Sequence, residues 1–285
     1  MTGPTHKHKV DLDLQKVRAP LEGRSVVVTR ARAQAEEITV GIEALGGIVI
    51  HCPTIEFTGP GDPAPLDSAI NRVETFEWIV FASSNAVTFF FDRLNQIRPD
   101  GVASLIGLVT CAIGPATARA LGAAGVEADL VPEVATSEGA LAAIIEFAGS
   151  REALSGVRFL IPRARVAREV LPTELERLGA LVEAVEAYQT IPPNIDTGRI
   201  IALLQEGAID AITFTSPSTV ANFALLVGAQ DLSRLLANCL AACIGPVTAA
   251  TARQYGLQNL IEAEKHTSAS LIEVIASSLS NKQRT

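Results

Sequence analysis

The sequence predicts an α/β fold with parallel β-sheets in two similar domains, and three observations lead to this prediction. Short runs rich in Val, Ile and Phe alternate with amphipathic segments of roughly ten to fifteen residues, which is typical of repeated βα units. Motifs of the first half of the chain recur in the second half. The chain has 285 residues, of which 48% are hydrophobic, and this suffices for two buried cores.

Eight runs of β-branched and other apolar residues have the composition of buried parallel strands. Helical patterns separate them, and Gly, Pro, Ser or Thr stands at many of the boundaries. We therefore expect eight strands joined by helices. In chain order, the expected strands cover residues 24–30, 46–52, 77–83, 107–113, 157–163, 180–186, 210–216 and 240–245.

The internal repeat keeps an almost constant register over most of the chain. Such self-similarity predicts two units with the same succession of strands and helices. A shift of 133 residues pairs Arg30 with Arg163 and Ser83 with Ser216, and a shift of 131 pairs residues 114–117 with 245–248 and Thr136-Ser137 with Thr267-Ser268.

The charged residues and glycines exclude several functions. The net charge of −8 at pH 7 argues against nucleic-acid binding through phosphate neutralisation. No lysine occurs between Lys16 and Lys265, so this stretch has neither a Schiff-base lysine nor a phosphate loop of the GxxxxGK type. The glycines follow no GxGxxG pattern, so a dinucleotide site is not expected.

The cysteines and histidines favour a reduced protein without a metal. The four cysteines lack CxxC spacing and are expected to be buried thiols of a cytoplasmic protein. Of the four histidines, His6 and His8 lie in a polar leader and His51 stands at a strand end, so a three-histidine metal site is out of reach. Neither a membrane helix nor a secretory signal is expected.

Polar residues follow several of the expected strands, and ligands of open parallel sheets bind at the carboxyl ends of strands. Helix N-termini there would direct N–H groups and positive dipole ends at an anion. Two such edges facing each other would form a cleft for a polycarboxylate or polyphosphate. Helix capping is the alternative role of the same Ser, Thr and Asn residues, and the sequence leaves both roles open.

These motifs, in their order and spacing, resemble the uroporphyrinogen-III synthase family over roughly residues 21 to 280. The motifs that carry the resemblance are Arg30, SSNAV (83–87), IGPATA (113–118), PRA (162–164), LGALVEAVEAYQT (178–190), TFTSPSTV (213–220) and IGPVTA (244–249).

The resemblance implies a discontinuous domain arrangement. Each domain would be a five-stranded parallel sheet flanked by helices, of the flavodoxin-like type, and a two-stranded linker would join the two domains and permit closure. The implied limits are 1–23 for a flexible tail, 24–52 plus 194–281 for the first domain, 58–187 for the second domain, and 53–57 and 188–193 for the linkers.

The resemblance implies a lyase that cyclises hydroxymethylbilane, a linear tetrapyrrole with eight carboxylates, to uroporphyrinogen III in tetrapyrrole biosynthesis. Ring D is inverted and water is lost, with no metal and no organic cofactor. We expect a cytoplasmic monomer that makes a transient contact with hydroxymethylbilane synthase, and neither a nucleic-acid nor a membrane partner.

The resemblance also implies roles for individual residues. Tyr188 matches the family tyrosine that assists departure of the substrate hydroxyl as water. Val247 stands where family members carry a second threonine, so one hydroxyl donor is missing. The residues expected to bind substrate carboxylates are Arg30, Ser83, Ser84, Asn85, Thr117, Arg163, Ser216, Ser218 and Thr248.

Two other interpretations remain open at this point. A non-catalytic two-lobed ligand-binding or sensory module for an anionic small molecule would share the architecture. Such modules are usually exported or carry an added DNA-binding domain, and neither feature is expected here. A nucleotide- or sugar-dependent transferase would need a Gly-rich phosphate loop or an acidic ribose or metal partner, and neither is found. The products formed from hydroxymethylbilane separate the three interpretations.

Overall fold

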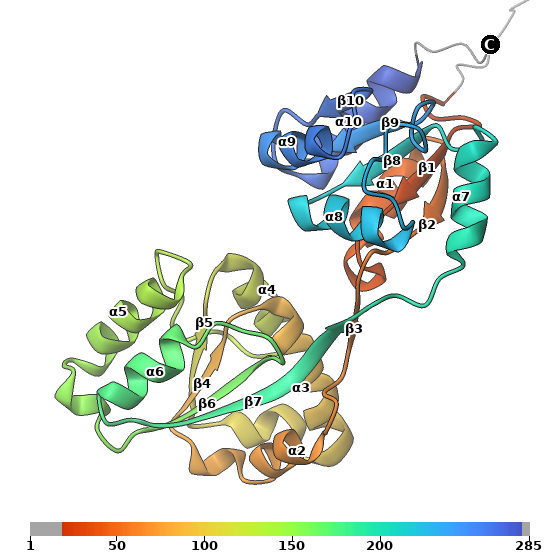
Figure 1. Ribbon diagram of the computed structural model, residues 1–285. Coiled ribbons are helices and arrows are strands. Elements are labelled where there is room, and N and C mark those ends of the chain that lie inside the picture. The colour runs from red at the N-terminus through yellow and green to blue at the C-terminus, as the bar shows by residue number, and fades with distance from the viewer. Residues whose placement is uncertain (1–18, 281–285) are drawn as a thin grey trace, which may run out of the picture. The chain divides into compact units, whose positions relative to one another are not determined.

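The computed structural model describes residues 19–280 (Figure 1). The predicted flexible tail, residues 1–23, lies outside the described residues as far as residue 18. Its last part is not a tail, because Leu21 is fully buried and its amide donates to the Leu45 carbonyl oxygen at 2.9 Å. An apolar side chain in the core ties this segment to the first unit.

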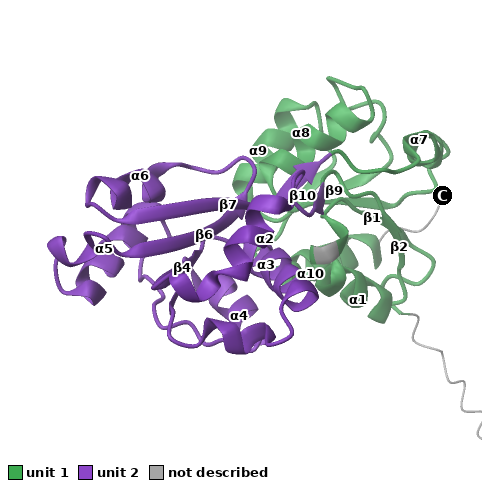
Figure 2. Cartoon of the chain, turned by 90° about the horizontal axis from the view of Figure 1, so that it is seen from below, with its two compact units in different colours: residues 1–55, 192–285 green, residues 56–191 purple. Residues whose placement is uncertain are grey.

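The described chain divides into two compact units, coloured separately in Figure 2. Unit 1 comprises residues up to 55 together with those from 192 onward, and unit 2 comprises residues 56–191. Unit 1 is therefore built from two distant parts of the sequence, and unit 2 from one continuous stretch.

Unit 1 contains a five-stranded sheet in which all neighbouring strands are parallel. The order β10-β9-β8-β1-β2 is the flavodoxin-like order when strands are counted along the unit. Its strands are β1 (Ser25–Val28), β2 (Ile48–His51), β8 (Ala211–Phe214), β9 (Leu240–Cys243) and β10 (Leu260–Glu262). Its helical elements are η1 (Arg32–Gln34), α1 (Glu36–Ala44), α7 (Thr197–Gln205), α8 (Pro217–Leu226), α9 (Pro246–Gln254) and α10 (Ser268–Ser280).

In unit 2 the order is β3-β7-β6-β4-β5, in which the four parallel strands β5-β4-β6-β7 follow the succession 2-1-3-4 and β3, the first strand of the unit, is added at the edge beside β7. Its strands are β3 (Glu56–Thr58), β4 (Trp78–Phe81), β5 (Val109–Ala112), β6 (Arg158–Ala164) and β7 (Leu181–Ile191). Its helices are α2 (Ala64–Asn71), α3 (Ser84–Ile97), α4 (Pro115–Ala123), α5 (Ser137–Ala148) and α6 (Val170–Arg177), with short 3-10 turns η2 (Val73–Thr75), η3 (Gly101–Leu105) and η4 (Glu152–Leu154).

Two expectations for unit 2 need correction. Its sheet is not wholly parallel, because β3 pairs antiparallel with the end of β7. The chain enters the unit through β3 and leaves it through β7, so adjacent entry and exit segments run in opposite directions. Residues 188–191 were predicted as linker but belong to β7, because the pairing with β3 extends this strand to Ile191.

Each of the eight predicted strands is present, and the α/β fold class is confirmed. Two strands lie outside these eight runs, β3 and β10, and each has three residues and stands at the edge of its sheet. Strand β3 overlaps the expected linker 53–57, whereas β10 was not expected. A strand of three residues is too short to show the alternation by which strands are recognised.

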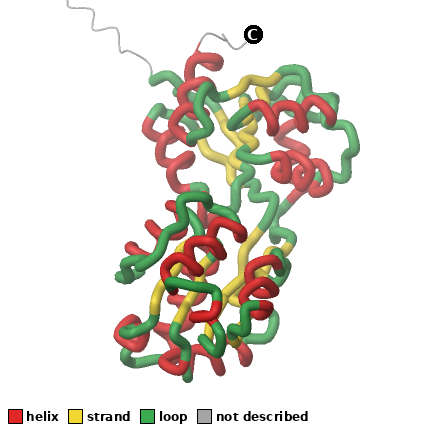
Figure 3. Tube along the Cα trace, turned by 90° about the vertical axis from the view of Figure 1, so that its left-hand side faces the viewer, coloured by secondary structure: helices red, strands yellow, loops and turns green. Residues whose placement is uncertain are grey.

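Helices cover both faces of each sheet, as the tube drawing of Figure 3 shows. In unit 1, α1 and α10 pack on one face, and α7, α8 and α9 pack on the other. In unit 2, one core lies under α2, α3 and α4, and a second lies under α5 and α6. Within the described range, no helix combines the length and the hydropathy that crossing a bilayer requires.

Candidate functional site

Each sheet has a topological switch point, where successive connections turn to opposite sides of the sheet. The switch lies between β1 and β8 in unit 1 and between β4 and β6 in unit 2. The predicted residues Arg30 and Ser216 follow β1 and β8, Ser83 follows β4, and Arg163 lies near the end of β6. The structure therefore places these four residues where open α/β sheets bind their ligands.

Tyr188 lies in β7 beside the switch point of unit 2 and is only 8% exposed. Its hydroxyl oxygen is 3.2 Å from the Ser83 Oγ. The ring stacks on Phe89, with centroids 5.6 Å apart, and meets the edge of Phe57 at 5.8 Å. The phenol is thus held on both sides and hydrogen-bonded at its tip.

A β-bulge sets the direction of the Tyr188 side chain. Neighbouring residues of a regular strand point to opposite faces of the sheet. Here Arg163 pairs with Glu186, whereas Ala164 pairs with Tyr188, so Ala187 is the extra residue of β7. Ala187 and Tyr188 consequently belong to the same core cluster. The bulge re-aims the tyrosine toward the side of the sheet that α3 covers.

Ser83 has two roles in this arrangement. It is the N-cap of α3, and its Oγ accepts a hydrogen bond from the Ala86 amide at 3.1 Å. The same hydroxyl contacts Tyr188, so one residue joins the start of a helix to the phenol. Ser84 and Asn85 follow in the first turn of α3 and are half-buried.

The repeat-related Ser216 is the N-cap of α8, and among the described residues of unit 1 no tyrosine hydrogen-bonds to it. Its Oγ accepts from the Thr219 amide at 3.2 Å, and the Thr219 hydroxyl closes a capping box. Ser218 is exposed, and its Oγ lies 2.9 Å from the Ser216 Oγ. A serine therefore caps the corresponding helix in each unit, and in unit 2 this serine also contacts the Tyr188 phenol.

Thr117 and Thr248 need correction as sources of hydroxyl donors. Both side chains are only 3% exposed, in the first turns of α4 and α9. The Thr117 hydroxyl donates back to the Ile113 carbonyl oxygen at 3.5 Å. At these positions the helix offers its backbone amides, which lack intrahelical partners in the first turn. The neighbouring Val247 is 68% exposed and adds an apolar surface there.

The two predicted arginines have different surroundings. Arg163 forms an ion pair with Glu169 at 2.7 Å, and it lies within β6 rather than after it. Arg30 is half-buried, and its Nε donates to the Gln34 Oε1 at 3.4 Å. Among the described residues Arg30 therefore has no carboxylate partner, whereas the charge of Arg163 is partly compensated.

Sequence reasoning missed Phe57 and Phe89, which hold the tyrosine ring. Phe89 opens an FFF run in α3, and the other two aromatic rings of that run, Phe90 and Phe91, face the core. The FFF run was the available signal, because an amphipathic helix directs only part of such a run into the core, and here the first ring is left half-buried.

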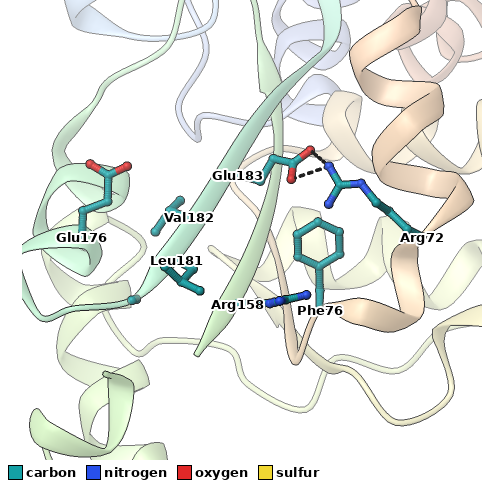
Figure 4. Close-up of a pocket in the computed structure, with 8 residues that line it drawn as sticks. Arg72, Phe76, Arg158, Glu176, Leu181, Val182 and Glu183 are labelled. Carbon is teal, nitrogen blue, oxygen red and sulfur yellow. Dashed lines mark hydrogen bonds and ion pairs between the residues drawn. The ribbon is translucent and has the colours of Figure 1, made fainter. Parts of the chain in front are cut away.

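A cavity of about 490 Å³ lies at the other end of the unit 2 sheet, where β6 and β7 begin (Figure 4). Its lining includes Arg72, Phe76, Arg158 and Leu181. The Arg72 guanidinium bonds both carboxylate oxygens of Glu183, at 2.6 and 2.7 Å. This cavity lies at the amino ends of the strands and is separate from the switch point.

The four cysteines are buried and none forms a disulfide. Burial raises the pKa of the Cys52, Cys111 and Cys243 thiols to about 12, because the thiolate is poorly solvated there. Thiols of this kind are unreactive near neutral pH, so we assign them to packing.

The fold and its strand ends define a class of proteins with two doubly wound α/β units, whose ligands bind at the carboxyl ends of strands. The family model described as "Uroporphyrinogen-III synthase HemD" matches residues 36–273. The chain belongs to the uroporphyrinogen-III synthase family. The resemblance inferred from the sequence motifs is confirmed.

Individual relatives agree with the family assignment. The uroporphyrinogen-III synthase of Synechococcus elongatus is 32% identical over 253 residues, covering 87% of this chain and 92% of the relative. That of Chlorobaculum parvum is 29% identical over 258 residues, covering 90% and 99%.

Two solved structures share the fold. A mutant uroporphyrinogen III synthase from the extremely thermophilic bacterium Thermus thermophilus has a TM-score of 0.54 at 18% identity, and the match covers 91% of this chain and all of that one. The uroporphyrinogen-III synthetase of Helicobacter pylori has a TM-score of 0.52 at 20% identity, covering 89% and 99%.

Proposed function

We propose that this chain cyclises hydroxymethylbilane to uroporphyrinogen III, with inversion of ring D and loss of water. The observation that carries the proposal is the Tyr188 phenol, held 3.2 Å from Ser83 at the switch point of unit 2 in a chain of this family. A sensory module would need no buried phenol at its ligand site, so the non-catalytic interpretation is not favoured.

In this proposal each unit offers binding groups for substrate carboxylates, unit 2 at the starts of α3 and α4 and unit 1 at the starts of α8 and α9. First-turn amides and the positive ends of helix dipoles favour anions. The hydroxyls of Ser84, Ser216 and Ser218 and the Asn85 amide add donors at the surface, and Thr117 and Thr248 contribute backbone amides. The guanidinium groups of Arg30 and Arg163 are suited to bidentate carboxylate binding.

The proposed role of Tyr188 is to donate a proton to the hydroxyl group of the substrate as the C–O bond breaks and water leaves. The Ser83 Oγ accepts from the Ala86 amide, so its own proton can be donated to the phenol oxygen. The phenol proton is then available to the substrate. Proton transfer from a positioned side chain contributes roughly 10²–10⁴-fold to a rate.

Incubation of the purified chain with freshly prepared hydroxymethylbilane tests the function directly. We expect uroporphyrinogen III at a rate proportional to protein concentration, whereas spontaneous closure yields isomer I. The two isomers are separated chromatographically after oxidation to the porphyrins. Formation of isomer I alone, at every protein concentration, would overturn the proposal.

The Ser83→Ala variant tests the link between the helix cap and the phenol. We expect the free energy of unfolding to fall by about 1 kcal/mol, because the α3 cap is lost. We also expect kcat to fall about tenfold, because the phenol loses its hydrogen-bond partner. Chemical denaturation and the isomer assay measure the two effects.

Thr136→Ala is the matched control for this variant. Thr136 caps α5 in the same unit and accepts from the Gly139 amide at 3.1 Å. Helix α5 covers a different core cluster from the one that contains Tyr188. The control should lose the same stability and keep its turnover. Equal turnover in the two variants would remove Ser83 from the proposed mechanism.

We further propose a cytoplasmic monomer that receives its substrate by transient contact with hydroxymethylbilane synthase. The four cysteines are buried and form no disulfide, which supports a reducing compartment. Direct transfer would limit spontaneous closure of the linear substrate to isomer I. Light scattering should give the mass of one chain, and a mass of two chains would contradict this part of the proposal.

A further inference from the structure

Unit 1 contains a cavity of about 500 Å³ beside β2 and α7. Strand β2 is the edge strand of its sheet, and α7 stands next to it in Figure 1. Arg32, His51 and Arg199 line the cavity together with the apolar side chains of Ile195, Ile200 and Leu203. Cavities of roughly 300–1,000 Å³ with apolar walls and a few polar groups are typical of small-molecule sites.

Neither arginine of this cavity has a partner for its charge among the described residues. Within residues 19–280, no hydrogen bond or ion pair involves either the Arg32 or the Arg199 guanidinium. The one carboxylate of the lining, Asp196, is the N-cap of α7 and accepts from the Arg199 amide at 3.0 Å. The lining groups therefore carry an excess of positive charge in a protein whose net charge is −8.

His51 adds a polar atom that lacks a partner. Its Nδ1 is buried and forms no hydrogen bond, the one side-chain atom of this kind in the described residues. Buried polar nitrogens are nearly always satisfied, and an unsatisfied one calls for an explanation such as an absent ligand or water. The imidazole ring lines the same cavity as the two guanidinium groups.

The free edge of β2 supplies further donors. The amides of Ile48 and Cys52 donate toward the β1 side of the strand. Because alternate residues of a strand direct their amides to opposite sides, those of Val49 and His51 face the edge that has no neighbouring strand. Both residues line the cavity. The backbone donors of β2 and the side-chain donors of the two arginines therefore line the same cavity.

We propose that this cavity binds an organic acid, with its carboxylate on Arg32 and Arg199 and its apolar body against Ile195, Ile200 and Leu203. Paired N–H groups of a guanidinium match the two oxygens of a carboxylate. The apolar wall favours an acid with a hydrocarbon or aromatic part over an inorganic anion. This inference does not rest on the proposed catalytic function.

The proposal is tested on the full-length chain with 4-phenylbutyrate as the probe. We expect saturable amide shifts confined to the surroundings of Arg32 and to residues 48–51 and 194–203 in nitrogen–proton correlation spectra. Two control compounds should bind at least about tenfold more weakly: 4-phenylbutanamide, because it lacks the carboxylate, and inorganic phosphate, because it lacks the apolar body. No saturable shift with phenylbutyrate, or equal binding of the uncharged amide, would overturn the proposal.

Matched variants assign the binding to the two arginines. Arg32→Gln and Arg199→Gln should each raise the Kd for phenylbutyrate about tenfold. Arg234→Gln, an exposed residue of the same unit outside the cavity, should leave it unchanged. Unchanged binding in both cavity variants would also overturn the proposal. Thermal unfolding of all three variants should match the parent chain, because each side chain is exposed.

Either a small organic acid or a tetrapyrrole can supply the carboxylate that binds in this cavity. Uroporphyrin I carries eight carboxylates and serves as the competitor. Displacement of phenylbutyrate by uroporphyrin I would assign the cavity to a tetrapyrrole carboxylate. Simultaneous binding of both would assign it to a separate organic acid.

Discussion

The Tyr188→Phe variant is expected to lose about 10²–10³-fold in kcat while its free energy of unfolding changes little. Phenylalanine preserves the stacking on Phe89 and the edge contact with Phe57, so the packing around the ring is retained. The change removes only the hydroxyl group and its 3.2 Å contact with Ser83. An interaction made chiefly in the transition state lowers kcat and kcat/KM together.

Steady-state formation of uroporphyrinogen III measures this effect, with denaturant unfolding as the measure of stability. Tyr255→Phe is the control, because Tyr255 is the other tyrosine of the chain and lies at the C-cap of α9 in unit 1. The control should keep its turnover. A Tyr188→Phe enzyme with kcat within a factor of two of the parent would exclude the phenol as the proton donor.

The Gly139→Ala variant is expected to lower the free energy of unfolding of unit 2 by about 2–3 kcal/mol. Gly139 lies in the first turn of α5, directly against the backbone of Val134. A Cβ at this position would overlap the Val134 carbonyl oxygen and lie 3.0 Å from the Val134 Cβ. The obstacle is backbone, so the start of the helix or the preceding loop must move.

The single tryptophan reports on this variant. Trp78 lies in β4, and its ring contacts Phe147 of α5 at a centroid distance of 5.2 Å. Its fluorescence during denaturation therefore follows the docking of the helix that the substitution disturbs. An unfolding midpoint equal to that of the parent chain would contradict the prediction, because it would show that the loop before α5 moves without loss of stability.

Ser270 is the matched position in the other copy of the repeat. Its amide bonds the Thr267 Oγ1 at 3.2 Å, as the Gly139 amide bonds the Thr136 Oγ1 at 3.1 Å. Ser270 carries a Cβ without overlap, and its Oγ accepts from the Lys265 amide at 3.2 Å. Ser270→Ala should therefore cost only about 1 kcal/mol, the loss of one hydrogen bond.

The fold class, the repeat and the approximate location of the candidate site could all be predicted from the amino-acid sequence. The apolar runs around Val26–Val28 and Ile212–Phe214 could be read as strands because side chains buried on both faces leave a continuous signal. Ser83, Thr136 and Ser216 could be read as helix starts because capping is a local interaction, formed between residues three positions apart.

Features that depend on contacts between residues distant in the chain emerged from the three-dimensional structure. The antiparallel pairing of β3 with β7 and the contact of Tyr188 with Ser83 join segments about a hundred or more residues apart, and no local pattern encodes them or the bulge at Ala187. The burial of Thr117 and Thr248 follows from packing in the same way. Local side-chain chemistry is therefore readable from the sequence, whereas the direction in which a side chain points depends on its strand register and on the surfaces packed around it.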